Sequence, residues 1–200
     1  MAHLHGLGVL HSDLKPENVL YDGSNARVSD LGTATPVVPL VGCGAEYLCT
    51  ITYRAPENML GGAVTLSGDL WAAGVTFARM ITGTIPFYNA HCLSEYGMLI
   101  EIFKALGTPT AATWPGHAAL RNWSAFPNFV STPDSVSAAL GIPRGDALDV
   151  VLGFLRFDPS KRTTFEEALW TPLLAPSAQA PCTASPVSRK RPAPEVIQLS

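Results

Sequence analysis

Two short apolar runs near the start of the chain limit most strongly what this sequence can fold into. Val19-Leu20-Tyr21 and Arg27-Val28-Ser29 are each predicted to be β-strands, and Asp22-Gly23-Ser24-Asn25 between them is a favourable turn sequence. A hairpin of this kind brings its two outer ends together. The polar side chains that flank the hairpin are therefore expected to converge: Asp13, Lys15, Asn18 and Asp30.

This set of side chains suits the transfer of a phosphoryl group. A carboxylate can accept the proton of the attacking hydroxyl, and an ammonium can neutralise charge on the phosphate that moves. An amide oxygen and a second carboxylate are hard oxygen ligands of the kind that Mg²⁺ prefers. A single Asp or Lys in a loop is usually only a solvated charge, so the inference depends on the four side chains occurring together.

Three motifs give this cluster a context. The stretch from His11 to Asn18 fits the pattern H-x-D-L-x-x-x-N, and Asp30-Leu31-Gly32 and Ala55-Pro56-Glu57 follow it along the chain. They resemble, in that order, the catalytic loop, a variant of the D-F-G signature and the A-P-E motif of the eukaryotic protein kinases. The resemblance implies a protein serine/threonine kinase that uses ATP and Mg²⁺ as cofactors.

The resemblance also implies roles for the individual residues. Asp13 would be the catalytic base, and Lys15 would be catalytic as the contact to the ATP phosphate. Asn18 and Asp30 would be the cofactor-binding ligands of the metal. His11 is expected to hold the catalytic loop in shape by packing and hydrogen bonding.

Residues 33 to 53 are irregular and match a kinase activation segment in length and position. The block from Thr50 to Glu57 resembles the T-x-x-Y-R-A-P-E sequence of the cyclin-dependent, mitogen-activated and glycogen synthase kinases. By this resemblance Thr50 would face the catalytic loop, and Arg54 would bind substrate and favour a proline after the target residue. Tyr47 would be a regulatory phosphotyrosine, or alternatively an aromatic side chain that only anchors the loop.

The expected regulation differs from that of many kinases. Ser12 stands where they carry an arginine that binds the phosphorylated activation segment, and Ala45 stands where they carry the phosphorylated threonine. No Lys or Arg occurs between Arg27 and Arg54. The threonine that would be phosphorylated and the arginine that would bind its phosphate are thus both absent. We therefore expect that activity does not require a phosphothreonine in this segment.

Three further carboxylates and cations are expected to have structural roles. Asp69, near the start of an apolar helix, would hydrogen-bond the backbone of the catalytic loop or satisfy free amides of its own helix. Arg162 lies in a D-P-x-x-R motif and would form a buried ion pair with Glu57. His5, by contrast, is expected to lie at the surface or at a helix end.

The fold class predicted is mainly α, a protein-kinase-like C-terminal lobe over residues 1–174 with one short hairpin at the catalytic loop. The helix that opens at Ser67 is apolar nearly all round and is therefore expected to be buried. Residues 175–200, rich in Ala, Pro and Ser, are expected to form a disordered tail.

Three shorter helices are predicted in the second half of the chain, at residues 99–107, 147–155 and 165–170. The stretch Ile102 to Thr110, with Trp114-Pro115-Gly116 after it, is closely similar to cyclin-dependent kinases. The Pro- and aromatic-rich sequence from there to about residue 143 would be that group's insert, irregular but packed.

Composition excludes several classes of partner. The net charge of −3 gives no reason to expect nucleic acid or an anionic membrane as a partner. The most apolar stretch, residues 70–81, is too short to span a bilayer. The four cysteines form no C-x-x-C pair, and without a secretory signal they are expected to be free thiols, consistent with a cytoplasmic or nuclear protein.

The resemblance covers the catalytic-loop side of a kinase only. The sequence contains no strand with a G-x-G-x-x-G loop, no V-A-I-K-like lysine and no helix that would bind a cyclin, so the N-terminal lobe is expected to be absent from it. Two functions remain open: a serine/threonine kinase with protein substrates and possibly a regulatory subunit, and a catalytically inactive lobe that docks a partner.

Overall fold

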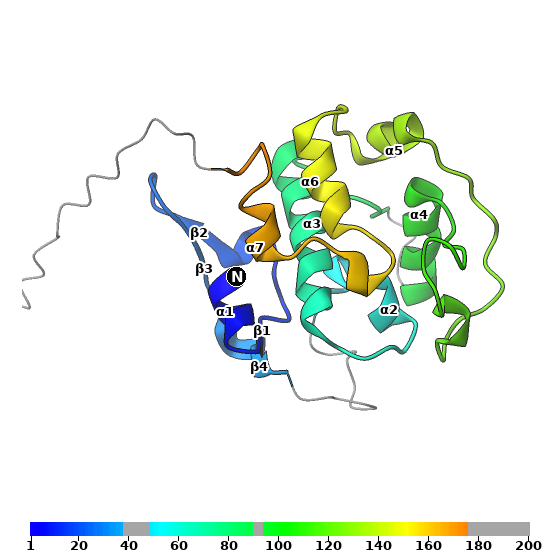
Figure 1. Ribbon diagram of the computed structural model, residues 1–200, viewed down its shortest axis with the longest axis horizontal. Helices are drawn as coiled ribbons and strands as arrows, with labels where there is room; N and C mark the ends of the chain where they lie inside the picture. The colour runs from blue at the N-terminus through cyan, green and yellow to red at the C-terminus, as the bar shows by residue number, and fades with distance from the viewer. Residues whose placement is uncertain (38–48, 90–93, 176–200) are drawn as a thin grey trace, which may run out of the picture.

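The computed structural model describes residues 1–37, 49–89 and 94–175, and is built around one long buried helix. This helix, α3 (Leu66–Thr82), has nine buried residues and ends at Gly83, whose backbone is left-handed (φ +75°). Figure 1 shows α3 beside α6 (Asp146–Phe154), with the short strands on one side and α4 and α5 on the other. The prediction of a buried helix opening near residue 67 is confirmed.

Close packing of α3 against α6 depends on a glycine. A Cβ placed on Gly74 would lie 2.8 Å from Cδ2 of Leu155 and 3.0 Å from Cβ of Phe154. The two helices therefore approach at a point where a side chain would collide with the facing residues. Around this point lie fully buried side chains, among them Trp71 and Val75.

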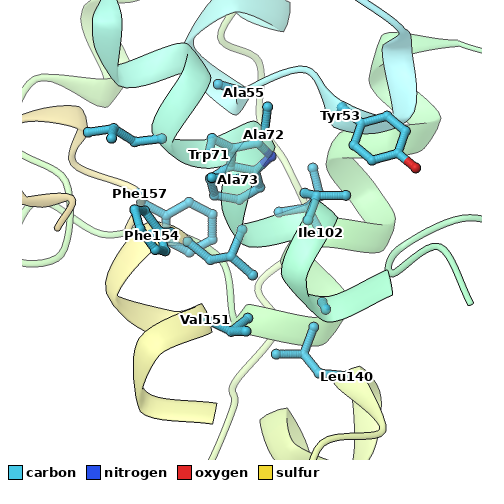
Figure 2. Packing of buried hydrophobic residues seen from close by; sticks show 14 of the residues in the cluster. Tyr53, Ala55, Trp71, Ala72, Ala73, Ile102, Leu140, Val151, Phe154 and Phe157 are labelled. Atoms are coloured by element: carbon cyan, nitrogen blue, oxygen red, sulfur yellow. The ribbon is translucent and has the colours of Figure 1, made fainter. Parts of the chain in front are cut away.

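Aromatic rings fill the centre of the core. The Trp71 ring lies 6.5 Å from that of Phe157, which is stacked in turn on Trp114 at 6.2 Å. Phe103 meets Phe157 edge-on at 5.6 Å. Trp71, Phe154 and Phe157 gather between α3 and α6 in Figure 2. These rings come from four separate parts of the sequence, so the core joins the helices into one unit.

The strands form two small antiparallel pairs. In the first pair, β2 (Val19–Tyr21) faces β3 (Ala26–Val28) with Val19 opposite Val28. The Asp22 carboxylate closes the turn by accepting hydrogen bonds from the N–H groups of Ser24 and Asn25. The predicted hairpin is confirmed, with its second strand one residue earlier than expected. The second pair joins β1 (Val9–Leu10) to β4 (Thr35–Pro36).

The helix α4 (Glu95–Leu106) begins four residues earlier than predicted. Ser94 caps it by accepting a hydrogen bond from the N–H of Gly97, and Gly107 ends it. The start signal is therefore a serine followed by an acidic residue, a common N-cap pattern.

The expectation that the sequence up to residue 143 is irregular is wrong in one part. Residues Pro133–Leu140 form helix α5, which has a proline in its first turn and ends at Gly141. Thr132 and Ser135 make a capping box, each side chain bonding to the other residue's backbone N–H. Start and stop signals were both present in the sequence, but the stretch between them is short.

The remaining elements are short. Helix α1 (Ala2–Gly6) leads into β1, α2 (Pro56–Met59) follows the A-P-E motif, and α7 (Phe165–Ala168) ends two residues before the predicted limit. The 3₁₀ helices are η1 (Pro16–Asn18), η2 (Leu31–Thr33), η4 (Ile51–Tyr53), η5 (His117–Ala119) and η6 (Pro159–Lys161). Among the described residues no helix is both long and apolar enough to cross a membrane. The predicted tail from residue 176 lies outside the described residues.

Candidate functional site

One buried carboxylate fixes the backbone of the loop that follows β1. Asp69, in the first turn of α3, accepts hydrogen bonds from the backbone N–H groups of His11 (2.8 Å) and Ser12 (2.9 Å). Ser12 has a left-handed backbone with φ of +69°, which is uncommon for a residue with a side chain. The two bonds hold this unfavourable conformation, and they set the direction in which the next residue, Asp13, leaves the loop. The contact predicted for Asp69 is present.

A third hydrogen bond to the same carboxylate comes from a residue that the sequence did not single out. His5 Nε2 lies 3.0 Å from Oδ2 of Asp69, and the His5 ring packs edge-on against Phe165 at 4.9 Å. Of the two positions expected for His5, the helix end is confirmed, because His5 lies in the last turn of α1, and the surface is wrong, because its side chain is only 13% exposed. Nothing in the sequence separates His5 from its neighbour His3, which also lies in α1.

Asp13 is the centre of the polar cluster. One carboxylate oxygen is 2.6 Å from Lys15 Nζ and 3.3 Å from Asn18 Nδ2. The other accepts hydrogen bonds from Thr50 Oγ1 (2.8 Å) and Thr50 N (3.3 Å). Partial burial by itself raises the pKa of Asp13, but the hydrogen bonds from Lys15 and Thr50 outweigh it and leave the pKa below its ordinary value. Asp13 is therefore ionised at neutral pH.

Lys15 and Thr50 also contact each other, with Lys15 Nζ donating to Thr50 Oγ1 at 3.2 Å. The hydrogen bond to Asp13 raises the pKa of Lys15, so this ammonium stays charged. Asn18 is buried and donates through Nδ2 to the Asp13 carbonyl at 2.8 Å. The structure thus brings together three of the four residues predicted to converge, and adds Thr50 from the activation segment.

Asp30 is the exception. Its carboxylate accepts a bond from Gly32 N at 3.3 Å, and within the described chain no hydrogen bond or ion pair joins it to Asp13, Lys15 or Asn18. Its neighbour Ser29 donates from N and Oγ to the Asn18 carbonyl, at 2.8 and 3.1 Å. Asp30 is therefore brought next to the cluster through the backbone, with an exposed side chain.

His11 joins the loop to the hairpin. Its Nε2 lies 3.0 Å from the Ser29 carbonyl, and its Nδ1 lies 3.3 Å from the Asp13 N–H. The ring is fully buried. This position agrees with a structural role rather than with proton transfer to a substrate.

Arg54 does not lie on an open surface. Its guanidinium donates to Glu95 in the first turn of α4 at 2.5 Å and to the Cys49 carbonyl at 2.9 Å. The side chain is 8% exposed, so direct contact with a substrate would require it to leave these partners. Beside it, burial raises the pKa of the Cys49 thiol to about 12, which keeps that thiol protonated. Tyr47 and Ala45 lie outside the described residues.

The predicted pair between Glu57 and Arg162 forms deep in the protein. Both guanidinium NH groups donate to the carboxylate, at 2.6 and 2.7 Å, in the bidentate geometry that favours Arg. Arg162 also donates to the Ser67 carbonyl at 2.8 Å and lies 5.1 Å over the Trp71 ring. This pair ties α2 to the loop before α7 and lies away from the Asp13 cluster.

The residues at the site fit a magnesium–nucleotide complex by their chemistry. The side-chain amide nitrogen of Asn18 donates to Asp13, so Oδ1 of Asn18 is the atom that can bind a metal ion. Asp30 carries an exposed carboxylate that can do the same. Mg²⁺ is commonly held by one or two such oxygens together with phosphate oxygens. Within the described ranges there is no group of three or more His, Cys, Asp or Glu that could hold a metal ion.

Comparison with known proteins places the chain. The family model for the protein kinase domain matches residues 1–174. The chain is 39% identical over 176 residues to cyclin-dependent kinase B2-1 of Oryza sativa subsp. japonica, with 86% of this chain and 52% of the relative covered. It is 36% identical over 173 residues to cyclin-dependent kinase B1-1 of Arabidopsis thaliana (84% and 54%) and to cell division control protein 2 homolog C of Antirrhinum majus (84% and 55%). The chain spans about half the length of these relatives. It belongs to the eukaryotic protein kinase family, as a member similar to the cyclin-dependent kinases.

Proposed function

We propose that this chain is the C-terminal, catalytic-loop lobe of a serine/threonine protein kinase. The single observation that carries the proposal is the arrangement around Asp13, where one carboxylate contacts Lys15, Asn18 and Thr50. A lobe that served only as a scaffold would have no need for these groups together. The match to the kinase domain over residues 1–174 supports the same extent for the lobe.

In this proposal the ionised Asp13 orients the hydroxyl of a target serine or threonine and accepts its proton. The low pKa makes Asp13 a weak base, so its main contribution is to position the hydroxyl, in keeping with a loose transition state. Lys15 already contacts Asp13 and Thr50, and it can turn its one remaining N–H donor to the transferred phosphate. Thr50 holds both side chains in place.

Asn18 Oδ1 and Asp30 would hold Mg²⁺ and, through it, ATP. When bound, Mg²⁺ neutralises charge on the phosphates and fixes their orientation. The hydrogen bonds from Ser29 to the Asn18 carbonyl keep the two ligands close together at the open end of the hairpin, Asn18 just before β2 and Asp30 shortly after β3. Similarity to cyclin-dependent kinases supports protein substrates with proline after the target residue, a regulatory subunit as partner, and Tyr47 as a regulatory position.

A second candidate is a docking lobe without catalysis. Four apolar side chains, one just after α1, two in β2 and one in η2, are more than half exposed: Leu7, Leu20, Tyr21 and Leu31. Such exposure favours a surface that another polypeptide covers. In the kinase proposal this polypeptide is the other lobe, which completes the ATP site. In the docking proposal it is a separate partner protein.

Phosphate transfer from labelled ATP to Ser-Pro and Thr-Pro peptides tests the proposal. The chain alone should show no transfer, because positioning supplies nearly all of the catalysis and half of the nucleotide clamp is missing. A chimaera that joins it to the N-terminal half of rice cyclin-dependent kinase B2-1 should transfer phosphate, and Asp13→Asn should abolish this transfer. Arg144→Ala, which removes an exposed ion pair, is the matched control.

The two parts of the proposal fail separately. If the chain alone transferred phosphate and Asp13→Asn abolished this transfer, the proposal that the chain is a single lobe lacking half of the nucleotide clamp would be wrong. A chimaera that unfolds cooperatively and binds ATP but transfers no phosphate would leave the docking function as the better account.

A further inference from the structure

A small, partly open cavity lies beside the loop that follows β1. It is about 30 Å³ in volume and lies between this loop, the segment before α2 and the start of α3. Leu10 and Ser12 line it from the loop, Cys49 and Ala55 from the segment, and Asp69 and Ala72 from α3. The remaining lining residues are Arg54, Asn58, Val64, Thr65 and Gly68, so polar and apolar side chains both reach the cavity.

One of these polar atoms is a buried hydroxyl. Ser12 is 8% exposed, and its Oγ has no hydrogen-bond partner among the described residues. Buried hydroxyl groups in native proteins nearly always have a partner, from the protein or from an ordered water. A second polar group with spare capacity is close to it. Oδ2 of Asp69 already contacts the His11 N–H and His5 Nε2, whereas within the described part of the chain Oδ1 accepts only from the Ser12 N–H.

The volume of the cavity limits the size of the molecule that can bind in it. A cavity needs roughly 10–15 Å³ of such volume to hold one water molecule, while an apolar ligand such as benzene has been bound in a cavity of about 150 Å³. The cavity here therefore has room for a water molecule or two and excludes organic ligands.

We propose that this cavity is a binding site for one ordered water, which accepts a hydrogen bond from Ser12 Oγ and donates one to Oδ1 of Asp69. The water completes the set of hydrogen bonds around Asp69 and fixes the side chain of the residue next to Asp13. The proposal does not depend on catalysis and is tested on the 200-residue chain without nucleotide.

The direction in which Ser12→Ala shifts the unfolding midpoint shows whether the Ser12 hydroxyl is bonded to a water or has no hydrogen-bond partner. If the water is present, Ser12→Ala removes a satisfied bond and should lower the unfolding midpoint by about 2–4 °C. If the hydroxyl has no partner, the same change removes an unsatisfied polar group and should raise the midpoint or leave it unchanged. Alanine and serine meet a similar penalty at φ +69°, so backbone strain cancels in the comparison.

Thr35 supplies a matched control. Its Oγ1 is also buried without a partner in the described chain, but Thr35 does not line this cavity. Thr35→Val keeps the shape and should raise the midpoint or leave it unchanged. A lower midpoint in both variants would overturn the proposal, because the loss would then follow from deleting a hydroxyl anywhere.

A crystal structure at about 2 Å resolution gives a direct second measurement. Density for a water within hydrogen-bond distance of both Ser12 Oγ and Asp69 Oδ1, absent in Ser12→Ala, is the expected result. A cavity without density, or Ser12 Oγ bonded to a protein atom, would overturn the proposal whatever the midpoints show.

Discussion

The Glu57–Arg162 and Asp13–Lys15 pairs have the same N···O distance, 2.6 Å, and very different surroundings. In the first pair the side chains are 6% and 0% exposed, and the guanidinium also bonds to backbone carbonyls and lies over Trp71. In the second pair the exposed fractions are 16% and 24%, and the carboxylate is shared with Thr50.

This difference shows how one polypeptide can use the same interaction for two purposes. A buried charge cannot exchange its partner for water, so the Glu57–Arg162 pair is permanent and costly to break. A partly exposed pair such as Asp13–Lys15 is worth less, because solvent competes with both members. Lys15 can therefore leave Asp13 for a phosphate at small cost, and this exchange is what the proposed chemistry requires.

The largest effect is expected from breaking the buried pair. Arg162→Ala leaves Glu57 charged, desolvated and without its cation, which should lower the free energy of unfolding by about 3–5 kcal/mol. Urea denaturation followed by circular dichroism measures the change. Replacing both members together with Leu and Met should recover most of the loss.

The control for this prediction is an ion pair of the opposite kind. Arg144 and Asp134 are 65% and 82% exposed, and Arg144→Ala should change the free energy of unfolding by less than about 0.5 kcal/mol. If Arg162→Ala cost no more than Arg144→Ala, the contrast between buried and exposed pairs would be wrong for this protein.

The next effect concerns Asp69, a buried carboxylate without a cation of fixed charge. Asp69→Asn keeps the shape but weakens the charge-assisted bonds to the N–H groups of His11 and Ser12, at a cost of about 1.5–3 kcal/mol. Amide hydrogen exchange at these two residues should quicken accordingly. Asp149→Asn, an exposed acid in the first turn of α6, is the control and should leave both amides protected.

A smaller loss is expected at His5. His5→Ala removes one hydrogen bond to Asp69 and the contact with Phe165, and should cost about 0.5–1.5 kcal/mol. His3→Ala in the same helix should cost much less, because His3 is exposed. Equal losses from the two substitutions would show that only helix propensity had changed.

A smaller effect on stability is expected at the partly exposed Asp13–Lys15 pair. Lys15→Met removes a hydrogen bond that lowers the pKa of Asp13, so that pKa should rise, while the stability at pH 7 should change by less than about 1 kcal/mol. Carbon-13 NMR titration of the Asp13 carboxyl measures the pKa directly. A pKa that stayed in place would assign the lowering to Thr50 instead.

The direction of the pH dependence follows from the same shift. The pKa of Asp13 is lower in the folded protein than in the unfolded chain, so its contribution to stability is complete above the unfolded value, about 3.9. The contribution is lost as the pH falls through the folded pKa. Lys15→Met should therefore flatten the loss of stability as the pH falls below about 4.

Much of the site could be predicted because its residues belong to contiguous motifs. The hairpin, the approach of Lys15 and Asn18 to Asp13, and the Glu57–Arg162 pair all depend on short patterns with a fixed spacing. Thr50 was found in the same way. Its contact with Asp13 crosses 37 positions, yet both partners lie within motifs.

What escaped prediction has no such local pattern. His5 meets Asp69 because α1 folds back over the start of α3, and its sequence context equals that of any histidine near a helix end. Arg54 was expected to bind substrate, and nothing in the motif shows that it would pair with Glu95. The exposed side chain of Asp30 depends on a left-handed backbone at that residue (φ +59°), which the D-L-G sequence does not reveal.

The bonds that Asp69 makes to the catalytic loop also have a consequence in time. His11 and Asp69 are 58 positions apart, and a ribosome adding about 5–20 residues per second needs roughly 3–12 s to cover that span. Throughout this interval the nascent loop lacks the carboxylate that holds Ser12 in its left-handed conformation. The Asp13 cluster can therefore reach its final geometry only after the start of α3 has been synthesised. A polypeptide released after Asp30 but before Asp69 would contain the motif residues up to Asp30 without the hydrogen bonds that position them.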